Sequence, residues 1–138
     1  MNSKASKLTA LALSVFVAGP MAAETVGQSE YMSSCAACHG ADGKGAGPMV
    51  GYLMGSVPDL TQLSSANGGV FPVTKVYSTI DGTMEVGSHG SREMPIWGNR
   101  YQLRGAAGAN PDFAASQAET FATFRILALT EYLASLQE

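Results

Sequence analysis

The residues best suited to chemistry in this chain are two cysteines and the histidine that follows the second, in the run Cys35-Ala36-Ala37-Cys38-His39. On a turn of helix, Cys35, Cys38 and His39 occupy positions i, i+3 and i+4 and therefore project from one face. A C-x-x-C-H run is the attachment signature of a c-type haem: each thiol adds to a vinyl group, and the imidazole binds the iron. The run predicts one covalently bound haem c with His39 as an iron ligand.

Other uses of the two cysteines are weaker. A disulfide between Cys35 and Cys38 would close a very small loop and add little stability. A redox-active C-x-x-C pair needs a βαβ context, whereas this pair follows a helix-like segment and precedes a Gly-rich loop. A zinc site needs four ligands, and the chain has two Cys and two His, with His89 far along the sequence from His39.

The second axial position of such a haem has two serious candidates. Met94 precedes Pro95, which removes a backbone N–H and favours an extended backbone, so that the thioether can project from a loop. His89 is the rival, and a bis-histidine haem would have a lower potential than a His/Met haem. Met32 is expected to pack in the core. The methionines without a comparable context are Met49, Met54 and Met84.

The first 23 residues differ from the rest of the chain. Lys4 and Lys7 precede an apolar stretch at residues 8–18, and small residues follow up to Ala23. This pattern is typical of a secretory signal peptide, and the apolar run is shorter than the roughly 18 residues of a membrane-spanning helix. We therefore expect a signal peptide at residues 1–23, a single domain at residues 24–138, no integral membrane span after cleavage, and a periplasmic location.

Composition limits the partners. With 138 residues, 14% of them charged and 16 of them glycine, the chain suits one compact, loop-rich domain. Removal of residues 1–23 takes away two of the eight Lys and Arg and none of the eleven Asp and Glu, which leaves six cations against eleven anions and a formal charge of −5. An acidic surface argues against nucleic acid or anionic lipid as a partner and favours a docking protein with a positive face.

The chain resembles the class I, mono-haem c-type cytochromes of the bacterial periplasm over essentially its whole mature length. Gly27 and Tyr31 precede the first haem cysteine by eight and four positions, and the C-terminal part offers the run Leu129-Thr130-Glu131-Tyr132-Leu133. The resemblance implies an all-α small cytochrome c fold, in which three or more helices wrap around one haem and the N- and C-terminal helices cross. The missing side chain of Gly27 would allow the close crossing, and Tyr31 and Tyr132 would pack there.

The resemblance also implies residues that support the haem. Pro48, nine residues after His39, is the expected carbonyl acceptor for the imidazole Nδ1 proton. Trp97 and Arg100 are the expected hydrogen-bond donors to the haem propionates. The stretch at residues 105–111 departs from the family pattern and is expected as a flexible insertion.

Hydrophobic periodicity places the elements. Helices are expected at 26–35, at 72–80, where Val73, Val76 and Ile80 share a face, and at 112–136, the principal core helix. Residues 41–58 are expected as Gly-rich loop, and the segment that carries Met94 and Trp97 as loop.

The sequence is compatible with three functions. The first is a soluble single-electron carrier that docks redox partner proteins at the haem edge. The second is a haem-bearing subunit of a periplasmic dehydrogenase complex. The third is a ligand-binding or peroxidase-type haem protein, which would follow if Met94 did not bind the iron.

Overall fold

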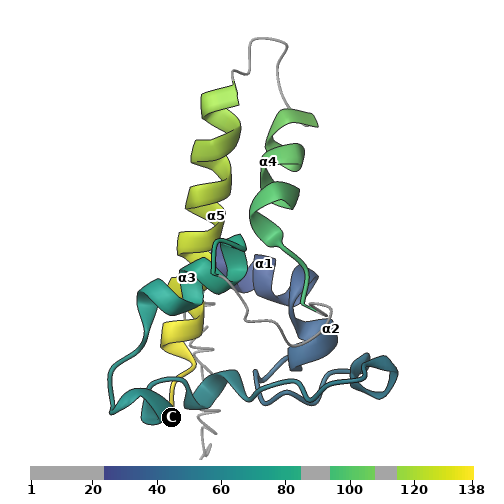
Figure 1. Cartoon of the computed structure of the whole chain (residues 1–138), viewed down its shortest axis with the longest axis vertical. Coiled ribbons are helices and arrows are strands. Elements are labelled where there is room, and N and C mark those ends of the chain that lie inside the picture. The colour runs from purple at the N-terminus through teal and green to yellow at the C-terminus, as the bar shows by residue number, and fades with distance from the viewer. Residues whose placement is uncertain (1–23, 85–93, 108–114) are drawn as a thin grey trace, which may run out of the picture.

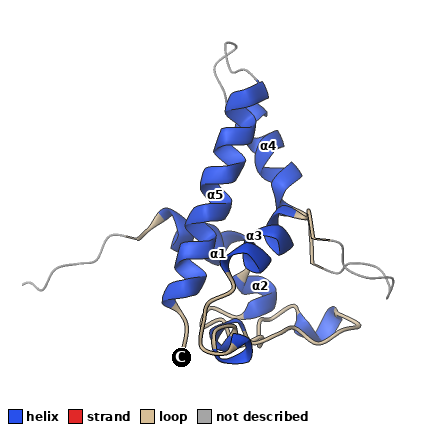
Figure 2. Cartoon of the chain, turned by 60° about the vertical axis from the view of Figure 1, so that its left-hand side comes forward, coloured by secondary structure: helices blue, strands red, loops and turns tan. Residues whose placement is uncertain are grey.

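The computed structural model describes residues 24–84, 94–107 and 115–138, which contain helices and irregular segments and no strand (Figure 2). The helices are α1 (Val26–Ser34), α2 (Ala36–His39), α3 (Val73–Asp81), α4 (Trp97–Ala107) and α5 (Ala115–Ser135), and three short 3-10 turns are η1 (Val50–Tyr52), η2 (Leu60–Gln62) and η3 (Ser65–Asn67). The predicted all-α fold is confirmed. The predicted signal peptide at residues 1–23 lies outside the described residues.

α1 crosses α5 at the predicted glycine (Figure 1). A Cβ atom on Gly27 would lie 2.7 Å from the carbonyl carbon of Ala128 and 2.9 Å from Cβ of Tyr132, so no larger residue fits there without a shift of α5. The rings of Tyr31 and Tyr132 pack at this crossing with their centroids 5.3 Å apart. Because the Tyr31 hydroxyl also donates a 2.6 Å hydrogen bond to the carbonyl of Gly40, the crossing is tied to the end of α2.

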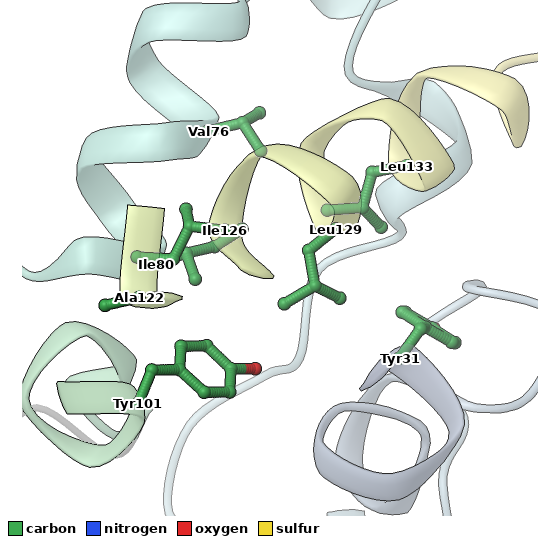
Figure 3. Packing of buried hydrophobic residues seen from close by; sticks show 8 residues of the cluster. All are labelled: Tyr31, Val76, Ile80, Tyr101, Ala122, Ile126, Leu129 and Leu133. Carbon is green, nitrogen blue, oxygen red and sulfur yellow. The ribbon is translucent and has the colours of Figure 1, made fainter. Parts of the chain in front are cut away.

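The core lies between α1, α3, α4 and α5 (Figure 3). α3 buries Val76 and Ile80, whereas Val73, expected on the same face, is 52% exposed. Gly82 ends α3 in the left-handed conformation, at φ 94°, with its N–H bonded to the carbonyl of Ser78. The cluster of buried apolar residues consists of Tyr31, Val76, Ile80, Tyr101, Ala122, Ile126, Leu129 and Leu133.

α5 supplies half of that cluster and is the principal core helix, as predicted. Its expected start near Asp112 lies outside the described residues, which resume at Ala115. Met32 was expected in the core, but this prediction is wrong, since its side chain is 46% exposed on α1. Among the described residues no helix combines the length and the apolar character that crossing a membrane requires.

α4 corrects parts of two expectations, because Trp97 and Gly98, expected in the loop that carries Met94, and residues 105–107, expected in a flexible insertion, lie in a helix; residues 108–111 of that insertion lie outside the described residues. α4 lies along α5 in both views (Figures 1 and 2). The two glycines of α4 are contact positions: a Cβ on Gly98 would meet the backbone carbonyl of Asp81 at 2.7 Å, and one on Gly105 would meet the Phe121 ring at 3.2 Å. Small residues at these positions let α4 approach α3 and α5 closely enough to bury Tyr101 completely.

Candidate functional site

The Cys35-to-His39 segment forms one helical turn that continues α1. The Cys35 N–H donates to the carbonyl of Tyr31 at 2.8 Å, and the His39 N–H donates to the carbonyl of Cys35 at 2.9 Å. This turn carries Cys35, Cys38 and His39 to the wall of one pocket, and both thiols are free. The i, i+3, i+4 spacing of the motif therefore places the three side chains on one face of the turn, as helical geometry requires.

The pocket has a cavity volume of about 250 Å³ and mostly apolar walls. His39 and Met94 line it together, although they are far apart in the sequence. Met94 and Pro95 enter from the segment that leads into α4, and the chain after η1 forms a further wall. The lining residues are Ser34, Cys35, Cys38, His39, Leu53, Ser56, Val57, Pro58, Met94, Pro95 and Trp97.

Trp97 and Arg100 occupy different places relative to this pocket. Trp97, the first residue of α4, lines it, and its ring centroid lies 6.0 Å from that of Tyr101. Arg100 is exposed and does not line the pocket, but its guanidinium carbon lies 5.1 Å from the Trp97 ring centroid, which is cation–π range. The rival ligand His89 lies outside the described residues.

The imidazole of His39 is held by a different proline from the expected one. Its Nδ1 lies 3.3 Å from the carbonyl oxygen of Pro58. Pro48 is exposed, and its neighbours are bonded to α2 itself: the N–H of Gly47 donates to the Cys38 carbonyl at 3.0 Å and that of Met49 to the Ala37 carbonyl at 2.9 Å. The chain around Pro48 thus lies against the backbone of α2, and only the later return of the loop brings a proline carbonyl to the ring.

Burial shifts the pKa values of the Cys35 thiol and of the His39 imidazole. Burial, with smaller contributions from the charges of Glu30 and Cys38, raises the pKa of Cys35 to about 12. Burial also lowers the pKa of His39 below its ordinary 6.5, against the opposing effect of the Pro58 carbonyl. The pocket therefore favours a neutral imidazole, which is the form that binds a metal.

Sequence reasoning missed the wall formed by Leu53, Val57 and Pro58. The pair Pro58-Asp59 was a local signal for an ordered end of this loop. The Asp59 carboxylate caps the turn η2 by accepting hydrogen bonds from the Thr61 N–H at 2.8 Å and from the Thr61 hydroxyl at 2.6 Å. An Asp that caps a turn directly after a proline indicates a fixed loop end rather than a mobile linker.

The residues of the pocket fit a covalently attached haem. Two thiols on one face of a turn, an imidazole and a thioether supply nitrogen and sulfur donors, and among the described residues no carboxylate lines the pocket. Apolar walls suit a flat apolar macrocycle and keep water from its centre.

Comparison with known proteins agrees with this assignment. The cytochrome c family model matches residues 25–137, which include the whole C-x-x-C-H turn and Met94. The searches of curated proteins and of solved structures gave no match. Because the matched region covers most of the chain and contains the two thiols, the imidazole and the pocket that they line, the chain belongs to the cytochrome c family, whose members use covalently attached haem for electron transfer.

Proposed function

We propose that this chain is a periplasmic single-electron carrier with one haem c, attached through Cys35 and Cys38 and ligated by His39 and Met94. The observation that supports it best is that Met94 lines the same apolar pocket as the two thiols and the imidazole. A thioether favours the reduced iron and raises the potential relative to a second imidazole. Two protein ligands would also close the iron to small molecules, which suits electron transfer.

The residues of the pocket have separate tasks in this proposal. The bound haem supplies the one-electron couple. Cys35 and Cys38 anchor it, and the Pro58 carbonyl orients the His39 ring by accepting the Nδ1 proton, which also makes the ring a stronger donor. Leu53 and Val57 provide apolar surface that excludes water.

Trp97 and Arg100 are proposed to contact the haem propionates. The Trp97 indole N–H comes from a ring that lines the pocket, and the Arg100 guanidinium carbon lies 5.1 Å from the centroid of that ring. An arginine held by an aromatic face is suited to bind a carboxylate with two hydrogen bonds.

The location and partners follow from the sequence. The signal-peptide pattern of residues 1–23 supports export, and c-type attachment takes place outside the cytoplasm in the systems that this chain resembles. The acidic mature chain supports docking of redox proteins with a positive face at the haem edge.

The test uses the full-length protein, expressed in a host with haem-attachment machinery and titrated by potential with optical detection. Met94→Ala should remove the sulfur-to-iron charge-transfer band and lower the potential by on the order of 100 mV, within the range of about 0.8 V that axial ligands span. Met94→His should also lower the potential. Met49→Ala is the control, because Met49 is 45% exposed and does not line the pocket.

Other outcomes would support the alternatives. A wild-type ferric spectrum of the high-spin kind with prompt carbon monoxide binding would contradict the carrier and favour a ligand-binding or peroxidase-type protein. An unchanged spectrum and potential in Met94→Ala would leave His89 as the ligand. Co-purification with a catalytic chain at fixed stoichiometry would place the protein as a subunit of a dehydrogenase complex.

A further inference from the structure

A buried carboxylate lies where α1, α4 and α5 meet. Glu30 is only 3% exposed, and its Oε1 lies 2.6 Å from Nη1 of Arg125. Nη1 of Arg104 lies 3.4 Å from both Glu30 oxygens. The two cations differ in burial, since the side chain of Arg125 is 26% exposed and that of Arg104 is 55% exposed. A buried ion pair of this kind is costly to form and needs an explanation beyond stability.

Aromatic rings hold both arginines in place. The guanidinium carbon of Arg125 lies 4.8 Å from the Phe121 ring centroid on α5, and that of Arg104 lies 5.8 Å from the Tyr101 ring centroid on α4. The fully buried Tyr101 hydroxyl lies near Glu30, although among the described residues no atom completes a hydrogen bond to it. The carboxylate thus has a fixed position and fixed counter-charges.

The carboxylate of this cluster lies on the same helix as the first haem cysteine's neighbour Ser34. Glu30 precedes Ser34, which lines the pocket, by one helical turn, and it precedes Cys35 by five residues. The Glu30 charge contributes to the raised pKa of the Cys35 thiol, so the carboxylate lies within electrostatic range of the attachment residue.

We propose that Glu30, with Arg125 and Arg104 as counter-charges, tunes the reduction potential of the haem attached at Cys35. Uptake of one electron lowers the local charge by one unit, so a fixed negative charge nearby opposes it and fixed positive charges favour it. Neither Glu30 nor the arginines are ligands here. The inference rests on the proposed haem attachment at Cys35 and does not depend on Met94 as the sixth ligand.

The experiment compares the midpoint potentials of variants of the haem-loaded protein in which a charged side chain is replaced by an uncharged one. Glu30→Gln should raise the potential and Arg125→Met should lower it, each by up to about a tenfold change in the redox equilibrium, which is 59 mV for one electron. Arg104→Gln should lower the potential by less, because Arg104 is half exposed. The double variant Glu30→Gln with Arg125→Met should return close to the wild-type value, since it removes both charges.

Matched controls and a second measurement separate this tuning from structural damage. Glu119→Gln removes one negative charge and Lys75→Gln one positive charge, both at exposed positions, and each should have little effect on the potential. Thermal unfolding of every variant reports loss of structure. Structural damage from the two substitutions would add in the double variant, whereas their charge effects on the potential would cancel. If Glu30→Gln does not fold, the two arginine variants carry the test: Arg125→Met and Arg104→Gln must both lower the potential, and by more than Lys75→Gln, which also removes one positive charge at an exposed position.

The proposal is overturned if Glu30→Gln and Arg125→Met shift the potential in the same direction, or if neither shift exceeds that of the controls. Failure of the proposed function gives a different result, namely absence of a reversible one-electron couple or a high-spin spectrum in the wild-type protein itself.

Discussion

The carbonyl oxygen of Pro58 lies 3.3 Å from Nδ1 of His39, across a loop that leaves α2, passes through η1 and returns to the pocket. A carbonyl can only accept, so this contact requires Nδ1 to carry the proton and leaves Nε2 free as the metal-binding atom. The same residue forms part of the pocket wall. Pro58 therefore links the shape of the pocket to the orientation and basicity of the imidazole.

Pro58→Ala should raise the reduction potential of the haem-loaded protein. The alanine keeps the carbonyl but loosens the loop, so the hydrogen bond to Nδ1 weakens and the imidazole becomes a poorer donor to the oxidised iron. The shift should reach at most about 60 mV, a tenfold change in a one-electron equilibrium. Pro48→Ala is the matched control, because Pro48 is exposed and its carbonyl is not the acceptor. A larger shift in Pro48→Ala than in Pro58→Ala would restore Pro48 as the supporting residue.

Gly27→Ala should destabilise the protein by about 1–3 kcal/mol. Alanine is intrinsically the better helix former by about 1 kcal/mol, so a loss of stability isolates the steric effect of a Cβ placed against the Ala128 backbone and Tyr132. Gly51→Ala is the control, because a Cβ there would meet nothing within 4 Å. Urea unfolding of the two variants gives the comparison, and equal midpoints would show that the crossing adapts to the extra carbon.

Short-range sequence signals were sufficient where one helical turn or one close approach decides the geometry. The contact of Gly27 with α5 was expected from the resemblance to the cytochrome c family, whereas the C-x-x-C-H turn is of this kind, because residue spacing on a helix fixes which side chains share a face. The N- and C-terminal helices and α3 were predicted for the same reason.

Tertiary contacts decided the features that the sequence did not predict. Gly98 was expected in the loop that carries Met94, and Gly105 in a flexible insertion, but both lie in α4 at the points where it contacts α3 and α5. Packing there outweighs their low helix propensity. Pro48 and Pro58 both follow His39 in a Gly-rich loop, and only the path of that loop determines which carbonyl reaches the ring. Sequence spacing carries no information about such a path.

Two buried tyrosines should respond oppositely to loss of the hydroxyl at neutral pH. Tyr31→Phe removes a buried 2.6 Å hydrogen bond to the Gly40 carbonyl and should cost about 1–2 kcal/mol. Tyr101→Phe removes a buried hydroxyl that completes no hydrogen bond among the described residues, and it should be neutral or stabilising by up to about 1 kcal/mol. Denaturant unfolding at pH 7 tests both. A cost in Tyr101→Phe equal to that in Tyr31→Phe would show that its hydroxyl has an acceptor in the haem-loaded protein.

The same tyrosines should make the protein sensitive to alkali. Burial raises the pKa of Tyr31 and of Tyr101 well above the ordinary value of 10.0, so the folded chain keeps both phenols protonated where the unfolded chain releases the protons. Above pH 10 the unfolded state therefore binds fewer protons, and stability falls by up to about 1.4 kcal/mol per pH unit for each tyrosine. Unfolding measured from pH 9 upward should show a shallower decline in Tyr31→Phe and in Tyr101→Phe than in wild type. Tyr52→Phe is the control, because that side chain is 82% exposed. An equally steep decline in both buried variants would mean that water reaches these hydroxyls in the folded protein.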